Sequence, residues 1–219
     1  MTAEHTATRL SVDVYLDLIC PWCWIGLRSL RTAIQALQRH SPDLAVQLVW
    51  HAAPLQPQIP DEGVDFQAFY LARLGSPAAV QARRAQVNAV AQSVGLRIDF
   101  EAMTTFAQSR LACALVEQAQ TRLSIEQMFA LLESLYAAYF SQGQNIGRPE
   151  VLQRLAQAAG VPWDAARMAA QPAGAHSPSG GVPLFVFNHR QAVSGAAPAA
   201  ELLQAMAQAA ALEQPLPPG

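Results

Sequence analysis

The feature that most constrains the fold of this chain is the tetrapeptide Cys20-Pro21-Trp22-Cys23, placed where a strand gives way to a helix. Residues 10–19 (LSVDVYLDLI) are rich in aliphatic and β-branched side chains, which is typical of a buried strand. Residues 22–37 then repeat apolar side chains at roughly helical spacing. A helix N-terminus offers unpaired N–H groups that stabilise a thiolate, so a C-x-x-C at this junction indicates a redox-active dithiol.

Composition excludes several other classes of protein. Hydrophobic residues make up 52% of the 219 residues and charged residues 14%, which predicts a large core rather than disorder. The net charge of −2 carries no long run of one sign, so we expect no nucleic-acid partner and no membrane surface. No apolar stretch is long enough to span a bilayer, and the N-terminus lacks the pattern of a secretory signal. These features predict a cytoplasmic protein.

The order of predicted elements is βαβ, about a hundred helical residues, then ββα. A second strand is expected over 45–51, and a proline-rich crossing follows over 54–60. Apolar periodicity predicts helices over 66–74, 77–94, 105–119, 125–140 and 149–159. Two strands, 182–187 and 190–193, and a helix over 198–212 complete the chain. We therefore predict an α/β protein, a thioredoxin fold with a large all-helical insertion.

The predicted boundaries divide the chain into two parts of one compact unit. Residues 1–61 and 171–219 form the thioredoxin-fold core, and residues 62–170 form the helical insertion. With three cysteines the chain can close one internal disulfide at most, so the fold does not depend on a disulfide framework.

Three segments of the sequence resemble the DsbA-like thioredoxin family, and within it the FrnE-type branch of dithiol oxidoreductases. Residues 17–26 (DLICPWCWIG) are similar to that branch's signature, and residues 181–187 (GVPLFVF) resemble the stretch with the fold's cis-proline. Leu55-Gln56-Pro57 lies where the family has an L-x-P element. The resemblance implies that Pro183 is cis and that the Val182 backbone is left free to pair with an extended substrate.

The chain departs from the family pattern around the substrate. The family often carries N-T-x-x-A-H on an insertion helix, whereas this chain has residues 104–109 (TTFAQS), which lack the Asn and the His. A related branch resembles 2-hydroxychromene-2-carboxylate isomerases and kappa-class glutathione transferases, and usually has serine at the first cysteine position. The presence of both cysteines counts against that activity.

The two cysteines have distinct expected roles. Cys20, the more N-terminal, is predicted to be the attacking thiolate, and Cys23 the buried resolving thiol. Pro21 and Trp22 set the redox potential and the exposed face of the motif. Trp22 is predicted to contact substrate, with packing under the insertion as the alternative, while Trp24 is predicted to be core.

Other residues allow a functional and a structural interpretation. Asp17 is either a group that moves protons for Cys23 or a solvated carboxylate at the strand end. Cys113 is interpreted as a buried, inert thiol, and Gly26 as a site where another segment approaches the helix. The remaining histidines have no ligand spacing with the cysteines, so we expect no metal site.

The sequence thus predicts a thiol–disulfide oxidoreductase that reduces or isomerises disulfides of proteins or small molecules. It binds no cofactor, and glutathione is a candidate redox partner. One alternative is a glutathione-dependent isomerase or transferase acting on a small aromatic or polyketide-like substrate. Another is a non-catalytic, chaperone-like binder. The Ala- and Leu-rich insertion helices leave a homodimer open.

Overall fold

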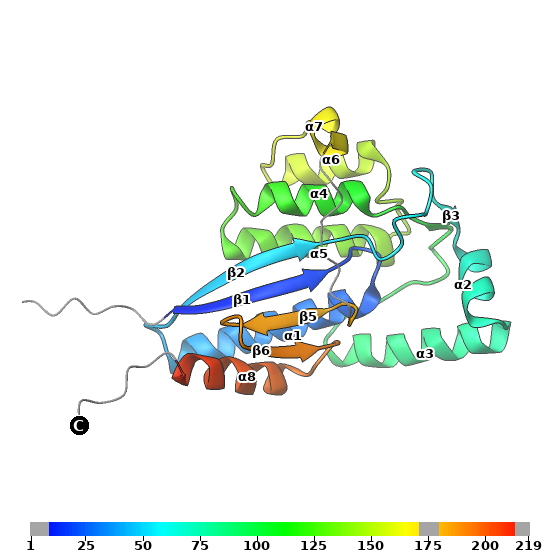
Figure 1. Cartoon of the computed structure of the whole chain (residues 1–219). Helices are drawn as coiled ribbons and strands as arrows, with labels where there is room; N and C mark the ends of the chain where they lie inside the picture. The colour runs from blue at the N-terminus through cyan, green and yellow to red at the C-terminus, as the bar shows by residue number, and fades with distance from the viewer. Residues whose placement is uncertain (1–8, 171–179, 213–219) are drawn as a thin grey trace, which may run out of the picture.

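A four-stranded sheet with strand order β2-β1-β5-β6 lies at the centre of the fold (Figure 1). The computed structural model describes residues 9–170 and 180–212. Parallel strands β1 (Arg9–Leu16) and β2 (Ala45–Ala52) are connected by helix α1 (Pro21–His40). Strands β5 (Leu184–Phe187) and β6 (Gln191–Ser194) run antiparallel, with β5 beside β1. The predicted βαβ and ββα halves are confirmed by this topology.

Alternation along β1 gives the sheet one buried face. Leu10, Val12, Val14 and Leu16 are at most 2% exposed, whereas the intervening residues are more polar. Because successive strand residues point to opposite faces, this set directs the core toward one side. Helix α8 (Ala199–Ala211) packs beside α1 and also contacts β1, β5 and β6.

The hairpin between β5 and β6 turns at the two residues expected from sequence. Asn188 and His189 have φ angles of 47° and 54°, the left-handed values that a tight two-residue hairpin needs. The Asn188 side chain accepts a hydrogen bond from the Ser11 amide and donates one to the Ala209 carbonyl. These contacts tie the turn to β1 and to the end of α8.

The chain between β2 and β5 forms two groups of helices. Helices α2 (Phe66–Leu74) and α3 (Pro77–Ser93) form an arm beyond the carboxyl end of β1 (Figure 1). Helices α4 (Arg110–Ala119), α5 (Ile125–Phe140), α6 (Pro149–Ala158) and α7 (Ala165–Ala170) stack beyond the edge strand β2. Helix α5 begins with a capping box, in which Ser124 and Gln127 exchange side chain–backbone hydrogen bonds.

The prediction of a helix over 105–119 is wrong at its start. Thr105 and Phe106 form strand β4, which pairs with β3 (Val64–Asp65), and the helix begins at Arg110. The Phe66 amide donates to the Thr104 carbonyl, so the pairing continues beyond the ladder. The insertion is therefore not wholly helical, because a tertiary contact between distant segments holds this stretch extended.

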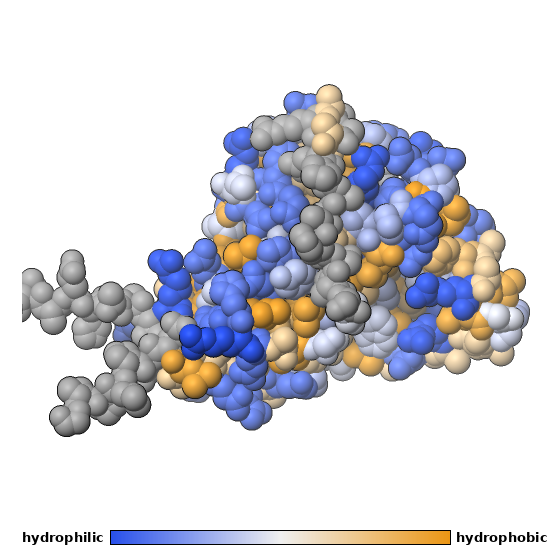
Figure 2. All heavy atoms as spheres, viewed as in Figure 1, coloured by the Kyte–Doolittle hydropathy of each residue, from blue (hydrophilic) through white to orange (hydrophobic). Residues whose placement is uncertain are grey.

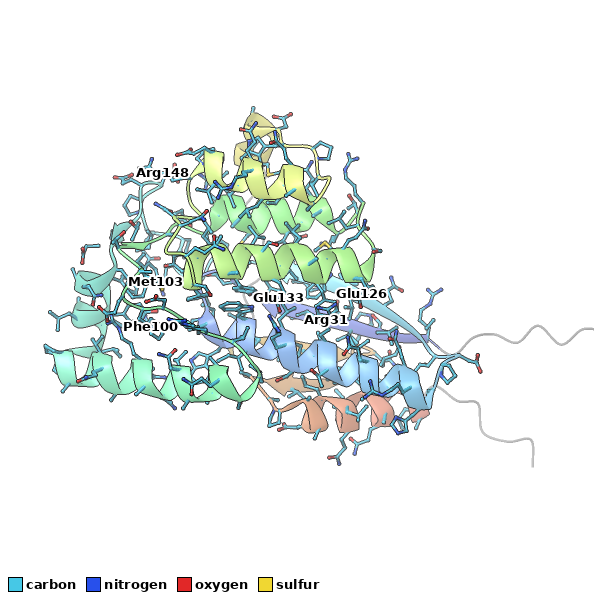
Figure 3. The ribbon with its side chains drawn as sticks, turned by 180° about the vertical axis from the view of Figure 1, so that it is seen from behind. Arg31, Phe100, Met103, Glu126, Glu133 and Arg148 are labelled. Carbon is cyan, nitrogen blue, oxygen red and sulfur yellow. The ribbon has the colours of Figure 1, made fainter. Side chains whose placement is uncertain are left out.

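Two sets of polar contacts fasten the insertion to the core. The Gln120 side chain accepts from the Trp50 amide and donates to the Trp50 carbonyl on the outer edge of β2, and Glu117 accepts from the Ala52 amide. On the opposite side, Figure 3 shows Arg31 of α1 pointing toward Glu126 of α5, at 2.6 Å. Arg28 pairs with Glu133 one turn further along. The insertion is thus fixed to the core at both β2 and α1.

Candidate functional site

The C-x-x-C motif lies at the first turn of α1. Cys20 is the N-cap residue, with extended backbone angles, and Pro21 occupies the first helical position. No side chain caps this helix end, and its first turn contains no acidic residue. The unpaired N–H groups of the first turn are therefore left to stabilise negative charge on a Cys20 thiolate.

Both cysteines of the motif are buried, as was predicted for Cys23. Cys20 is 7% exposed and Cys23 2% exposed, and all three cysteines of the chain are free thiols. The Cys23 amide donates to the Cys20 carbonyl at 3.1 Å, which places the two residues within one turn. Burial, together with the neighbouring Cys20 sulfur, raises the pKa of Cys23 well above its ordinary value. Cys23 is therefore a protonated, buried thiol at neutral pH.

The Val182–Pro183 segment faces the first cysteine. The bond between these residues is cis, the isomer that the resemblance implies. The Cys20 Sγ lies 3.9 Å from the Val182 carbonyl oxygen, a long contact between a thiol donor and a backbone acceptor. Residues separated by more than 160 positions in sequence are thus brought together at the thiol.

Gly26 explains how α1 can approach this segment. A Cβ atom at position 26 would lie 3.1 Å from both the Phe185 Cζ and the Pro183 Cγ. Both neighbours are buried, so they have little room to move. The expected close approach at Gly26 is confirmed, and it is made by the segment that carries Pro183.

Asp17 is fully buried, so the interpretation as a solvated strand-end carboxylate is wrong. Its Oδ2 accepts from the Leu55 amide at 2.7 Å, and its Oδ1 accepts from the Ile19 amide at 3.3 Å. Burial raises the pKa of Asp17 from 3.8 to about 6, while these amides and the nearby Ser109 hydroxyl oppose the shift. The segments that bury this carboxylate are distant in sequence, so the strand pattern could not reveal them.

Trp24 and Cys113 were both predicted to be buried, and both are. Trp24 is buried, as expected of core, and its Nε1 donates to Glu133 at 2.8 Å. Cys113 is also buried, and burial raises its pKa well above the ordinary value, as an inert thiol requires. Its Sγ lies 3.9 Å from the Asp17 Oδ1, a contact that the sequence did not indicate.

A cavity of about 330 Å³ opens beside Cys20. One wall consists of Cys20, Pro21, half-buried Trp22 and Val182, together with Leu55 and Gln56 of the L-x-P element. The opposite wall comes from α2, α3, β4 and the segment between α3 and β4. Its lining side chains are aromatic, basic or aliphatic: Phe66, Phe69, Tyr70, Arg73, Leu74, Val80, Arg83, Arg84, Val87, Phe100 and Phe106. Figure 3 shows Phe100 on the segment after α3, between the arm and α5. Of the predicted site residues, four line this cavity, Cys20, Pro21, Trp22 and Val182, whereas Cys23, Pro183 and Asp17 lie behind its surface.

Sequence reasoning missed the second wall. Phe66, Phe69 and Tyr70 recur at the spacing of one helical face, which was the available signal. The wall is built by ring contacts, among them stacking of Phe69 on Phe106 with centroids 3.7 Å apart. Burial raises the pKa of Tyr70 to about 12, so its phenol is neutral and can donate a hydrogen bond into the cavity.

Residues 9–170 and 180–212 contain neither a cluster of metal-binding side chains nor a membrane-spanning helix. No group of three or more His, Cys, Asp or Glu side chains in this part of the chain is arranged to hold a metal ion. Among the helices of the same residues, none has the length and apolar content needed to cross a membrane.

Comparison with known proteins identifies one family. The model of the DSBA-like thioredoxin domain matches residues 11–177. A search of the curated proteins finds no match. Among solved structures, the chain is similar to a probable DsbA oxidoreductase from Streptomyces coelicolor, with 26% identity and a TM-score of 0.75 over 95% of this chain and 93% of that one.

Two further solved structures are similar in fold. A 2-hydroxychromene-2-carboxylate isomerase has 15% identity and a TM-score of 0.56, covering 90% of this chain and 95% of its own. The cytosolic disulfide reductase DsbM from Pseudomonas aeruginosa, solved with GSH, has 18% identity and a TM-score of 0.53, covering 92% and 96%. At these identities the likeness concerns the fold alone.

Proposed function

The chain belongs to the DSBA-like thioredoxin domain family, and on that premise we propose that it is a thiol–disulfide oxidoreductase with Cys20 and Cys23 as its reactive pair. The observation that carries the proposal is the position of Cys20. Cys20 is the N-cap residue of α1, contacts the Val182 carbonyl and lines a cavity, while Cys23 lies buried in the first turn of the helix behind it.

The exchange has two steps in this geometry. The Cys20 thiolate attacks one sulfur of a substrate disulfide, forming a mixed disulfide and releasing the other sulfur as a thiolate. Cys23 then loses its proton and attacks the Cys20 sulfur, which closes the Cys20–Cys23 disulfide and releases the second substrate thiolate. Two electrons pass from the dithiol to the substrate, and the two protons from the cysteines go to the two released thiolates. Two equivalents of a monothiol such as glutathione would return the pair to the dithiol.

Asp17 is proposed to take up the proton of Cys23 in the second step. The Cys23 thiol lies beside the Asp17 backbone, and the charge of Asp17 contributes to its raised pKa, so the two groups influence each other. With a pKa of about 6, Asp17 is largely ionised near pH 7 and can accept a proton in a site that water does not reach.

Reduction of disulfides is the direction favoured in a reducing compartment. A cytosolic glutathione poise of about −220 to −320 mV would keep an ordinary dithiol reduced. The fold likeness to DsbM, described as a cytosolic disulfide reductase, is consistent with this direction.

A redox titration in glutathione buffers tests the proposal. We expect a single two-electron transition, followed by Trp22 and Trp24 fluorescence and by trapping of two thiols, and the same transition in Cys113→Ala. A protein whose Cys20 and Cys23 show no transition would not be an oxidoreductase of this type. The midpoint would also show whether the pair reduces or oxidises its partners.

A glutathione-dependent isomerase is the second candidate, because Cys20 opens into an aromatic cavity and the fold resembles an isomerase. That reaction needs no redox cycle, so it predicts activity in Cys20→Ser. Loss of every activity in that variant would exclude it.

A further inference from the structure

Three arginines of α2 and α3 line the cavity beside Cys20, and among residues 9–170 and 180–212 no acidic side chain lines it with them. Arg73 lies in the last turn of α2, and Arg83 and Arg84 follow each other on α3. The chain as a whole has a net charge of −2, so the positive lining is a local feature and not the average of the surface.

Arg84 has a structural role in the cavity wall. Its Nη1 lies 3.1 Å from Glu101, and its Nη2 donates to Gln67 at 2.6 Å. The guanidinium also lies over the rings of Phe66 and Phe100, at 5.8 and 5.5 Å from their centroids. Its guanidinium is therefore engaged by Glu101 and Gln67 and helps to hold the aromatic wall.

Arg73 and Arg83 differ from Arg84 in having no partner. Both side chains are exposed, and neither forms an ion pair or hydrogen bond with any residue that the structure describes. The charges of Arg73 and Arg83 act on the cavity together with that of Arg84, because all three lower the pKa of Tyr70 while the charge of Cys20 raises it. Tyr70 therefore lines the same cavity as the reactive sulfur and the arginines, and it is influenced by the charge of both.

From this arrangement we infer that the site takes small disulfides that carry a carboxylate on an aromatic or apolar body. The inference rests on the proposed function and names the substrate class of that site. The carboxylate would bind between Arg73 and Arg83, and the Tyr70 hydroxyl can donate to it. The apolar body would pack against the Phe69–Phe106 wall, with the scissile sulfur at Cys20. A cavity of about 330 Å³ suits a small molecule better than a folded protein segment.

The surface of the arm offers both apolar and charged side chains to such a ligand. On the face shown in Figure 2, both hydrophobic and hydrophilic side chains lie over α2 and α3. An anion approaching the reduced site meets arginine charge first and the aromatic wall second, so the charges act mainly on the rate of encounter.

The test compares an anionic and a neutral aryl disulfide. The probes are bis(carboxy-nitrophenyl) disulfide and dipyridyl disulfide, and the readout is the second-order rate constant for oxidation of the reduced protein by stopped-flow absorbance. Each rate is divided by that of free mercaptoethanol with the same probe, which removes the intrinsic reactivity of the disulfide. The preference is the ratio of the two normalised rates.

We expect wild-type protein to prefer the anionic probe at low salt. Arg73→Gln and Arg83→Gln should each lower the preference about threefold, and the double variant about tenfold, with a loss of most of its salt dependence. Arg73→Lys should retain most of the preference because it keeps the charge. Arg39→Gln is the matched control, since it removes one exposed arginine at the far end of α1.

Two results would overturn the inference while leaving the proposed function intact. In the first, both probes oxidise Cys20 and Cys23 but the preference is the same in wild type and double variant. In the second, Arg39→Gln lowers the preference as much as Arg73→Gln, which would assign the effect to net charge. If neither probe oxidises the dithiol, the proposed function fails and the inference fails with it.

Discussion

The two walls of the cavity differ in how they are held. The thioredoxin core forms one wall and holds Cys20 there, with Cys23 and Asp17 behind it, by backbone contacts and near-complete burial. The wall from the α2–α3 arm holds its aromatic rings and Arg84 by side-chain stacking, whereas Arg73 and Arg83 are exposed side chains of these helices. A buried residue held by backbone contacts tolerates few substitutions, whereas exposed side chains that stack on one another can be substituted one at a time. We therefore expect the core wall to determine the chemistry and the arm to determine which molecules reach it.

The strongest test of this division is the removal of the attacking sulfur. Cys20→Ser should lower disulfide reductase activity about a thousandfold or more, because a hydroxyl does not ionise at neutral pH. Turnover of a dialkyl disulfide by wild type and variant checks this. The matched Cys23→Ser variant should instead stop after the first step, and mass spectrometry should find one substrate half attached to Cys20. Full turnover in Cys20→Ser would break the division at once.

Asp17→Asn should separate chemistry from stability within the core wall. It should slow release of the mixed disulfide about tenfold to a hundredfold by removing the proton acceptor. It should also stabilise the protein above pH 6, because the charged form of Asp17 is disfavoured by burial. The folded state binds more protons between pH 3.8 and about 6, so wild-type stability falls as pH rises through that range. The wild-type protein should lose about 3 kcal/mol in the free energy of unfolding over this range, because each pKa unit corresponds to about 1.4 kcal/mol. Asp17→Asn should show no such loss.

Urea unfolding of wild type and Asp17→Asn at pH 4 and pH 8 measures this effect. The free energies of unfolding should converge at the lower pH and separate at the higher one. An equal difference at both values would show that Asp17 acts through packing and not through its charge.

Gly26→Ala tests the close approach of α1 to the Pro183 segment. Alanine favours a helix over glycine by about 1 kcal/mol, but its Cβ meets Phe185 and Pro183 at 3.1 Å. Because these neighbours are buried, we expect a net loss of about 1–2 kcal/mol in the free energy of unfolding. Ala33→Gly, on the buried face of the same helix, provides a comparison for a change without added volume. A stabilised Gly26→Ala would show that the contact yields.

Phe69→Leu should give the smallest change in activity, and it tests the contribution of the α2–α3 arm to substrate binding. Leucine removes the stacking on Phe106, so we expect KM for an aryl disulfide to rise about twofold to fivefold. The reduction potential of the dithiol and turnover of a dialkyl disulfide should stay unchanged. A shifted potential would mean that the arm takes part in the chemistry, which would weaken the division between the walls.

The parts of this site that sequence could predict are those encoded by neighbours in the chain. Cys20 and Cys23 are set by a local strand–helix junction, and the order of elements follows from apolar periodicity. The pairing of Thr105–Phe106 with β3 was not predicted, because a two-residue strand has no periodicity of its own. The burial of Asp17 was also not predicted, since Leu55 and Cys113 reach it from far along the chain.

The side chains of the arm illustrate the same limit. A helix containing Phe66, Phe69, Tyr70 and Arg73 was expected, but its orientation relative to Cys20 was not. Whether an exposed arginine is paired or free depends on acidic residues brought by the fold, as Glu101 is brought to Arg84. Only the three-dimensional arrangement separates the structural arginine from the two that face the cavity unpaired.

The contact between Gln120 and Trp50 covers the edge of the sheet at strand β2. An outermost strand offers unpaired backbone groups on which another chain can add, the usual start of aggregation. Here one amide side chain occupies the donor and the acceptor of the same residue, as a neighbouring strand would, and Glu117 occupies the next donor. A shortened protein without its helical half would therefore be expected to self-associate through this edge, not to behave as a minimal enzyme. Helix α4 would thus protect the edge of the sheet from pairing with another chain, a role separate from that of the α2–α3 arm beside Cys20.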